Sequence, residues 1–195
     1  MQTHLTADKN MLIKKHLLLL VLSVCSLLSV DAQNIFLGTG GKCSFHSYTP
    51  VEDIDAVSES LNSVLNTATG EIQFKVPLTS FHFQKALMQE HFNEKYVESA
   101  KYPFATFKGK INETINFTKD GTYEITATGI FNIHNIDKPH TEKATLIIKD
   151  GKFTINGKFK VAIKDHNIEV PKIVIANVAE VIDVTFSCSY TRYQK

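Results

Sequence analysis

Apolar and polar residues alternate along most of the chain beyond residue 40. The clearest run is KFTINGKFKVAIK, over residues 152–164. A period of two is typical of a β-strand with one buried face. The alternation keeps its phase through Asn156-Gly157, so the run predicts one continuous strand without a hairpin turn at that dipeptide. The apolar positions of the run are Phe153, Ile155, Gly157, Phe159, Val161 and Ile163.

Seven other segments show a similar alternation, which brings the number of predicted strands to eight. Asp150-Gly151 and Asp120-Gly121 fall where the alternation breaks, and because Asp-Gly favours tight turns, we predict a hairpin at each. The pattern therefore predicts an all-β protein. The seven segments are residues 42–48, 54–60, 71–76, 104–117, 122–134, 142–149 and 181–190.

The segment FHFQKALMQEHFNEKYVESAKYPFATFKGKI, residues 81–111, interrupts the strand pattern with helix formers among many aromatic rings. Leu87, Met88, Phe92 and Tyr96 are spaced by four residues or nearly so, which places them along one stripe of a short helix. Such a stripe is expected of a helix packed on a core, and equally of a helix that closes a cavity.

Eight strands with one apolar face each must close into a barrel or pack as two sheets. Strands longer than ten residues after Pro103 favour closure, and the bore of an eight-stranded barrel is filled by side chains or holds one small ligand. Two explanations then stay open for the small residues on the inward parity: a cavity, or relief of strain where the strands bend. These residues are Ala105, Gly109, Ala127, Gly129 and Gly157.

The N-terminal region has the features of a signal peptide. Lys14, Lys15 and His16 precede the apolar run LLLLVLSVCSLLSV, and Ala32 follows as a small residue suited to cleavage. The apolar run is shorter than the roughly 20 residues of a membrane-spanning helix, so no transmembrane anchor is expected. We predict translation from Met11, a signal peptide over residues 1–32, and export to the periplasm or the exterior.

The predicted mature chain, residues 33–195, has equal numbers of acidic and basic side chains, interleaved along its length. Nucleic acids are recognised by a basic excess on one face, so no nucleic-acid partner is expected. The length suits a single domain. The oligomeric state stays open, a homodimer included.

Two cysteines, Cys43 and Cys188, remain after cleavage. An even pair in an exported protein predicts one disulfide, with two buried thiols as the alternative. Cys43 shares parity with Phe45, and Cys188 shares parity with Phe186, so both cysteines are expected to face inward on the first and last strands.

No sequence motif supports catalysis, a metal site or a cofactor. The chain contains no His-x-His, His-Glu-x-x-His, Gly-x-Ser-x-Gly or phosphate-binding glycine motif. His82 and His91 flank the predicted helix and could form acid and base pairs with Glu90 and Glu94, although a solvated helix face accounts for them as well. A structural or protein-binding β-sandwich without a ligand is a further alternative.

Three blocks of the chain resemble one protein family. An F-x-F strand end, a short helix, an acidic turn and K-Y-P-x-A-x-F-x-G occur over residues 81–109, followed by GIFNIHNIDKP from Gly129 and DHNIEVP from Asp165. Together these blocks resemble the YceI-like family, over residues 39–192. The resemblance implies an exported, lipocalin-like, eight-stranded antiparallel barrel with a short helix near one mouth. Such a barrel would hold a polyisoprenoid, an isoprenoid quinone or a similar long apolar lipid for storage, transport or a stress response.

The resemblance also implies which residues bind the ligand, because side chains that point into such a barrel would contact the lipid. The helix would then be a lid over the mouth, with Phe81 and Phe83 beneath it. The residues expected to contact the lipid are Phe45, Phe74, Val76, Phe81, Phe83, Leu87, Phe92, Phe107, Ile111, Ile125, Phe131, Ile133, Phe159 and Phe186.

Overall fold

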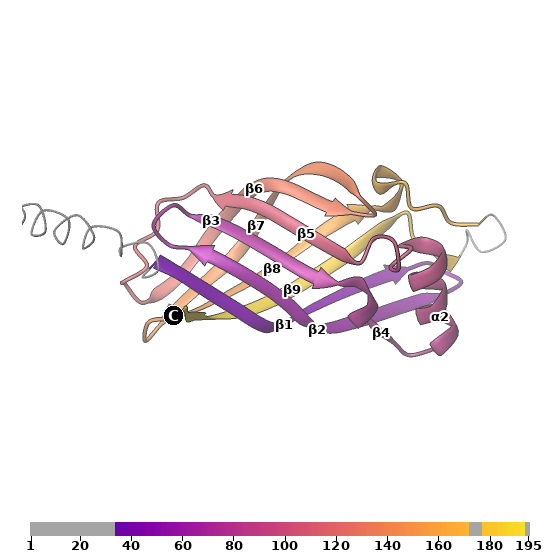
Figure 1. The fold of residues 1–195 in the computed structure, drawn as a ribbon, viewed down its shortest axis with the longest axis horizontal. Helices are drawn as coiled ribbons and strands as arrows, with labels where there is room; N and C mark the ends of the chain where they lie inside the picture. Colours follow the sequence, from indigo (N-terminus) through magenta and orange to yellow (C-terminus); the bar gives the residue numbers. More distant parts are fainter. Residues whose placement is uncertain (1–33, 172–176, 194–195) are drawn as a thin grey trace, which may run out of the picture. The chain divides into compact units, whose positions relative to one another are not determined.

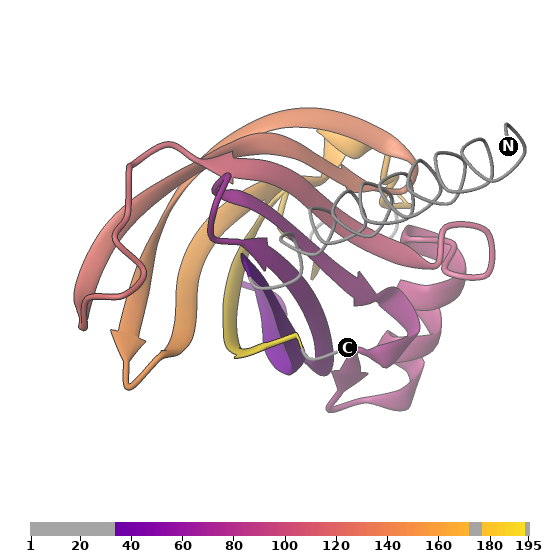
Figure 2. The ribbon, with the colours of Figure 1, turned by 60° about the vertical axis from the view of Figure 1, so that its left-hand side comes forward.

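The computed structural model describes residues 34–171 and 177–193, whose strands wrap into a closed antiparallel barrel (Figures 1 and 2). Around the barrel the order is β1-β9-β8-β7-β6-β5-β3-β2, and β2 pairs with β1 to close it. This confirms the predicted eight-stranded, lipocalin-like fold. The predicted signal peptide lies outside the described residues. The strands are β1 (Ile35–Tyr48), β2 (Asp53–Asn66), β3 (Glu71–Pro77), β5 (Phe104–Ile111), β6 (Gly121–Ile133), β7 (Ile136–Lys149), β8 (Lys152–Ala162) and β9 (Val181–Arg192).

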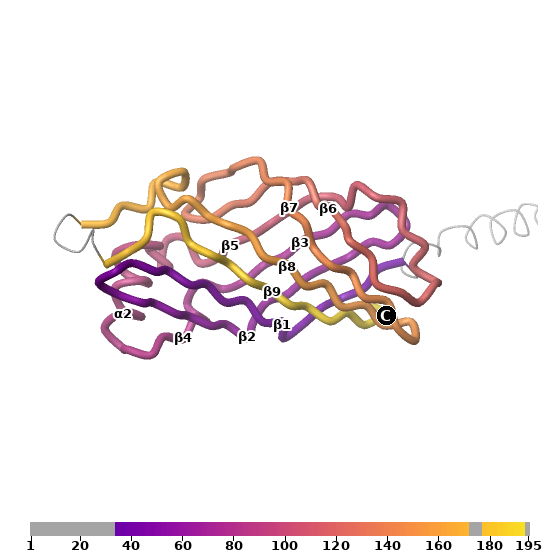
Figure 3. Tube along the Cα trace, turned by 180° about the vertical axis from the view of Figure 1, so that it is seen from behind, coloured from indigo at the N-terminus to yellow at the C-terminus, as the bar shows by residue number. Residues whose placement is uncertain are grey.

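The last strand completes the barrel by pairing with the first. Figure 3 shows β9 between β8 and β1, and both pairings are antiparallel. The continuous strand predicted through Asn156-Gly157 is confirmed, because Asn156 pairs with Ser187 and Gly157 with Phe186 within the β8–β9 ladder. β8 nevertheless ends at Ala162, and residues predicted to extend it form the 3₁₀ turn η4 (Ile163–His166).

Two tight turns connect the strands on either side of β7. Asp150 and Gly151 have φ of 51° and 70° and join β7 to β8, as predicted. His134 and Asn135 have φ of 54° and 59° and form a second two-residue turn between β6 and β7. A turn with positive φ at both positions matches the twist of the paired strands. This second turn makes β7 longer than the predicted strand over residues 142–149.

The hairpin predicted at Asp120-Gly121 is wrong. β5 ends at Ile111, which pairs with Ala127, and residues 112–120 form a longer connection to β6. Side chains of this connection accept backbone hydrogen bonds. The Asn116 side chain accepts the Thr118 N–H at 3.0 Å, and the Glu113 carboxylate accepts the Thr126 N–H at 2.8 Å.

The predicted short helix lies at one end of the barrel (Figure 1). It consists of α2 (Ala86–His91) and a π-helical turn, η3 (Phe92–Tyr96), in which the Val97 N–H donates to the Phe92 carbonyl at 3.0 Å. The 3₁₀ turn η2 (Leu78–Ser80) and the short strand β4 (His82–Phe83), which pairs with β2, lead into it. We call this end of the barrel the mouth.

The opposite end is filled by close-packed side chains. The Phe36 and Phe153 rings lie 4.4 Å apart, and Leu65 and Leu146 are fully buried beside them. Tyr190 is 1% exposed, and its hydroxyl donates to Ser63 Oγ at 2.6 Å while that hydroxyl donates to the Gln73 carbonyl. A buried tyrosine hydroxyl is stabilised by such a partner. Space for a ligand must therefore lie nearer the mouth.

The inward glycines do not leave empty space. A Cβ at Gly157 would lie 2.4 Å from the Phe186 ring, and a Cβ at Gly129 would lie 2.2 Å from the carbonyl oxygen of Lys108. Gly129 pairs directly with Gly109, so the two backbones approach closely. At these positions the cavity explanation is wrong, because the glycines accommodate close backbone and ring packing and leave no room for a ligand.

The predicted disulfide is not formed, because Cys43 and Cys188 are free, buried thiols. Cys43 lies opposite Phe186 on β9, whereas Cys188 lies opposite Ile155 on β8. The two cysteines are therefore not directly opposite each other in the β1–β9 ladder. Burial raises the pKa of the Cys43 thiol to about 12 and that of Cys188 to about 11.

Candidate functional site

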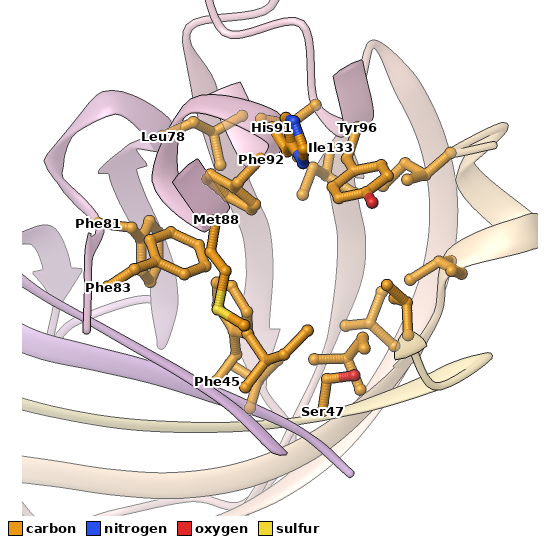
Figure 4. A pocket seen from close by; sticks show the side chains of 18 of the residues that line it. Phe45, Ser47, Leu78, Phe81, Phe83, Met88, His91, Phe92, Tyr96 and Ile133 are labelled. Carbon is orange, nitrogen blue, oxygen red and sulfur yellow. The ribbon is translucent and has the colours of Figure 1, made fainter. Parts of the chain in front are cut away.

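A cavity of about 400 Å³ occupies the mouth half of the barrel. We call it the mouth chamber. Figure 4 shows its side chains around an open space, with Phe81, Phe83 and Met88 on one side and Tyr96 and Ile133 on the other. Most of its lining side chains are apolar, and the polar ones are Ser47, Glu52, Lys85, His91 and Asn177. They come from both the barrel wall and the helical segment at the mouth.

Four phenylalanine rings form the wall under the helix. The Phe45 ring on β1 lies 5.3 Å from Phe81, 5.7 Å from Phe83 and 5.4 Å from Phe92. Phe92 in turn lies 5.1 Å from Phe83 and 5.8 Å from Phe81. Aromatic pairs at such separations favour tilted or edge-to-face packing, as found here. The aromatic residues of this segment therefore line a chamber and pack on each other at the same time.

The connection between β8 and β9 supplies another wall of the mouth chamber. Apart from Ile163, this wall was missed at the sequence level because its residues follow the end of β8, where the alternation stops. The resemblance of DHNIEVP to a family block was the one signal that pointed to it. Its residues are Ile163, Ile168, Val170, Asn177 and Val178.

Polar groups of the mouth chamber gather at its rim. Lys85 Nζ donates to Glu52 Oε1 at 2.8 Å, and the side-chain N–H of Asn177 donates to Glu52 Oε2 at 3.5 Å. The hydrogen bond from Lys85 lowers the pKa of the Glu52 carboxyl. Ser47, which is buried, accepts the Ala179 N–H at 2.9 Å. These contacts bring the end of β1, the β1–β2 loop, the residue before α2 and the β8–β9 connection together.

A second cavity of about 90 Å³, the inner chamber, lies deeper in the barrel. No residue of the helical segment, α2 and η3, lines the inner chamber. Phe74, Phe107, Ile125 and Phe186 line only this smaller space. Five side chains belong to the walls of both chambers and therefore form their boundary: Cys43, Val76, Ala105, Phe131 and Phe159.

The structure brings thirteen of the fourteen predicted ligand-binding residues into these two walls. Ile111 is the exception, because it is buried near the end of β5 and lines neither chamber. Leu87 lines the mouth chamber although it is 60% exposed. The predicted residues that line the mouth chamber are Phe45, Val76, Phe81, Phe83, Leu87, Phe92, Phe131, Ile133 and Phe159.

Hydrogen bonds of His134 join three segments at the mouth. Its Nε2 lies 2.7 Å from Glu98 Oε2, its Nδ1 lies 3.0 Å from the His166 carbonyl oxygen, and its ring packs on Tyr102 at 4.6 Å. The hydrogen bond to His134 lowers the pKa of Glu98, and burial lowers the pKa of His166. The sequence showed no periodic signal for this cluster, because its members lie in turns and loops.

The polar clusters outside the mouth chamber have structural explanations. His46, Asp53 and Asp55 lie near one another on the β1–β2 hairpin, where His46 Nδ1 is 2.9 Å from Asp55 and 3.3 Å from Asp53. These are exposed contacts across a hairpin, and the one between His46 and Asp55 is a hydrogen bond. Of the four residues considered above as acid and base pairs, His82, Glu90 and Glu94 are exposed, and His91 lines the mouth chamber. Within residues 34–171 and 177–193 no hydrogen bond joins either histidine to either glutamate.

A barrel with an apolar chamber beneath a short helix agrees with the family resemblance noted in the sequence. The model of the YceI-like domain matches residues 36–190. The chain belongs to the YceI-like family. A comparison with curated protein sequences found no match. Within the part of this YceI-like chain that the structure describes, no helix is long and apolar enough to cross a membrane.

Solved structures share the fold of this YceI-like chain. A polyisoprenoid binding domain from Saccharophagus degradans, implicated in plant cell wall breakdown, matches with a TM-score of 0.70 at 13% identity, over 83% of this chain and 99% of that one. BcnA from Burkholderia cenocepacia matches with a TM-score of 0.66 at 16% identity, over 77% and 96% of the two chains. A Campylobacter jejuni YceI protein matches at 0.55 and 15% identity, over 72% and 85%. At these identities the likeness shows the shared barrel fold.

Proposed function

We propose that this YceI-like protein is exported and binds the apolar chain of an isoprenoid or similar long-chain lipid, an isoprenoid quinone included, in the mouth chamber. Storage, transport or a stress response would each use this activity, which requires no catalysis. The observation that carries the proposal is the apolar mouth chamber itself, with its volume of about 400 Å³. The name of the Saccharophagus degradans domain, which describes polyisoprenoid binding, supports the same class of ligand.

Physical chemistry favours a chain-like lipid as the occupant. Water in the mouth chamber would find few hydrogen-bonding partners, because polar groups such as Glu52 and Lys85 gather at the rim. A lipid chain gains about 0.8 kcal/mol for each methylene that leaves water. A few isoprenoid units are therefore sufficient for stable binding, while the headgroup lies near the polar rim.

Export is the second part of the proposal, and it rests on the N-terminal sequence. The intact mass of the mature protein tests it: a chain beginning at Gln33 is expected after cleavage at Ala32. A mature protein that keeps Met11, or one that begins at a lipidated Cys25, would show that the N-terminal segment is processed differently.

Identification of the natural ligand tests the binding activity. The mature protein is purified from an exporting host without detergent, extracted with chloroform and methanol, and the extract is compared with that of a mock purification by mass spectrometry. We expect one lipid class with a long apolar chain to be enriched. An extract indistinguishable from the mock would favour a barrel with a structural or protein-binding role and no lipid.

A further inference from the structure

Four phenylalanine rings lie across the barrel interior near the boundary between the two chambers. Phe74 on β3 lies 5.0 Å from Phe186 on β9, and these strands are not neighbours in the barrel, so the contact crosses the bore. Phe186 lies 6.2 Å from Phe159 on β8, and Phe159 lies 5.6 Å from Phe131 on β6. We call these four rings the ring partition.

The packing of the ring partition holds its rings in place. The Phe186 ring fills the space that a side chain at Gly157 would occupy, since a Cβ there would lie 2.4 Å away. The Phe131 ring lies 5.3 Å from both His140 and His166. His166 is buried, and its Nδ1 lies 3.2 Å from the Ile136 carbonyl. Rings packed on several sides are not free to turn aside without disturbing their neighbours.

We propose that the ring partition limits the length of apolar chain that the protein encloses, with Phe159 as the residue that stops the chain. The inference rests on the proposed lipid-binding function and adds a size limit to it. The mouth chamber, at about 400 Å³, is at the low end of the roughly 300–1,000 Å³ typical of small-molecule pockets. Behind the ring partition only about 90 Å³ remains.

This geometry determines how affinity depends on chain length. Each methylene buried raises affinity roughly fourfold, so short chains should bind more tightly with every added unit. Once the mouth chamber is full, further units stay outside the rim and add little. Affinity should therefore rise with length and then level off. Phe159 belongs to the walls of both chambers, so its truncation connects them and moves the plateau to longer chains.

The test is a titration of the lipid-free mature protein with linear isoprenoid alcohols of two, three, four and eight units, by displacement of a fluorescent fatty acid. For the natural sequence we expect affinity to rise up to three or four units and the eight-unit alcohol to bind within about threefold of the four-unit one. In Phe159→Ala the eight-unit alcohol should bind at least about tenfold more tightly than in the natural sequence, equivalent to about two more buried methylenes.

Phe117→Ala is the matched control. Its ring packs on Phe153 at 5.4 Å and lines neither chamber, so this variant should keep the natural length profile. Phe159→Leu removes less of the side chain and should move the plateau in the same direction by a smaller amount. If circular dichroism shows that Phe159→Ala is unfolded, Phe159→Leu is used in its place.

The outcomes separate the size limit from the proposed function. Affinity that rises steadily to eight units in the natural sequence, or a length profile unchanged in a folded Phe159 variant, would overturn the size limit while leaving lipid binding intact. Failure of every alcohol to displace the probe from the natural sequence and the variants would overturn both.

Discussion

His134 and Glu98 form a short hydrogen bond, with 2.7 Å between Nε2 and Oε2, that ties the turn between β6 and β7 to the segment after the mouth helix. The same imidazole contacts the carbonyl of His166 through Nδ1, at 3.0 Å. Because His166 is buried against Phe131, this cluster connects the rim of the mouth chamber to its inner wall. The cluster therefore holds the β6–β7 turn, the segment after η3 and η4 together.

The stability of the barrel should fall on mild acidification because of His166. Burial lowers the pKa of His166 below its ordinary value of 6.5, and this effect outweighs the hydrogen bond to the Ile136 carbonyl, which raises the pKa. The charges of His140 and Lys138 lower this pKa further, and that of Asp165 raises it. Below pH 6.5 His166 becomes protonated in the unfolded chain, whereas in the folded chain it becomes protonated only at a lower pH. The free energy of unfolding therefore decreases as the pH falls. The thermal midpoint of the natural protein should drop more between pH 7.5 and 5 than that of His166→Asn. Equal pH slopes in the two proteins would contradict this explanation.

The mature protein should contain two free thiols after denaturation without reductant. In the folded protein both should react slowly with maleimides, because burial raises the pKa of Cys43 to about 12 and of Cys188 to about 11, which leaves little thiolate at neutral pH. Thiol titration with and without denaturant measures both quantities. Absence of free thiol in the denatured protein would instead support the disulfide predicted from the sequence.

Gly129→Ala should destabilise the barrel by about 3 kcal/mol, as overpacking against a backbone does. The added Cβ would lie 2.2 Å from the Lys108 carbonyl oxygen and 2.5 Å from the Cα of Gly109, and neither atom can move without bending β5. In the control Gly121→Ala the nearest atoms belong to the Tyr123 side chain, at 3.2 Å, which can shift. For the control, urea denaturation should show that the free energy of unfolding changes by no more than about 1 kcal/mol. Similar stability of both variants would argue against close strand approach at Gly129.

Leu87 should matter for ligand binding and little for stability. Its side chain is 60% exposed yet lines the mouth chamber, so Leu87→Ser should change the unfolding free energy by about 0.5 kcal/mol or less. Loss of apolar contact with a bound chain should weaken lipid affinity by about tenfold. Ile130→Ser, on the outer face of β6, is the control and should leave affinity unchanged. Equal affinities for Leu87→Ser and the natural protein would place the lipid away from α2.

The sequence predicted the strands well where the alternation has a constant phase. β8 has one phase throughout, and the strand predicted over residues 152–164 runs only a little past its end at Ala162. β1 and β2 were predicted only over residues 42–48 and 54–60, because their mutual register shifts between Gly38 and Cys43. A bulge reverses which parity faces inward, so the first half of β1 and the second half of β2 lose the pattern that a period of two would reveal.

The candidate site was predictable only in part for a related reason. Inward parity identifies strand residues such as Phe45, Phe131 and Phe159, and the aromatic segment identifies Phe92. Parity does not determine how deep in the bore a side chain lies, so Ile111 and Phe186 could not be distinguished from residues of the mouth chamber. Ile168 and the other wall residues after β8 lie outside regular strands, where periodicity gives no information.

The central claim is that the mouth chamber holds one lipid chain, and native mass spectrometry of the mature protein tests it most directly. Ala105 lies in the walls of both chambers, so Ala105→Leu narrows the bore from within, while Lys108→Leu places the same side chain on the outer face of the same strand. The natural protein and Lys108→Leu should each carry one bound lipid per chain, and folded Ala105→Leu should carry much less. A natural protein without bound lipid, or equal lipid occupancy in all three proteins, would contradict the account.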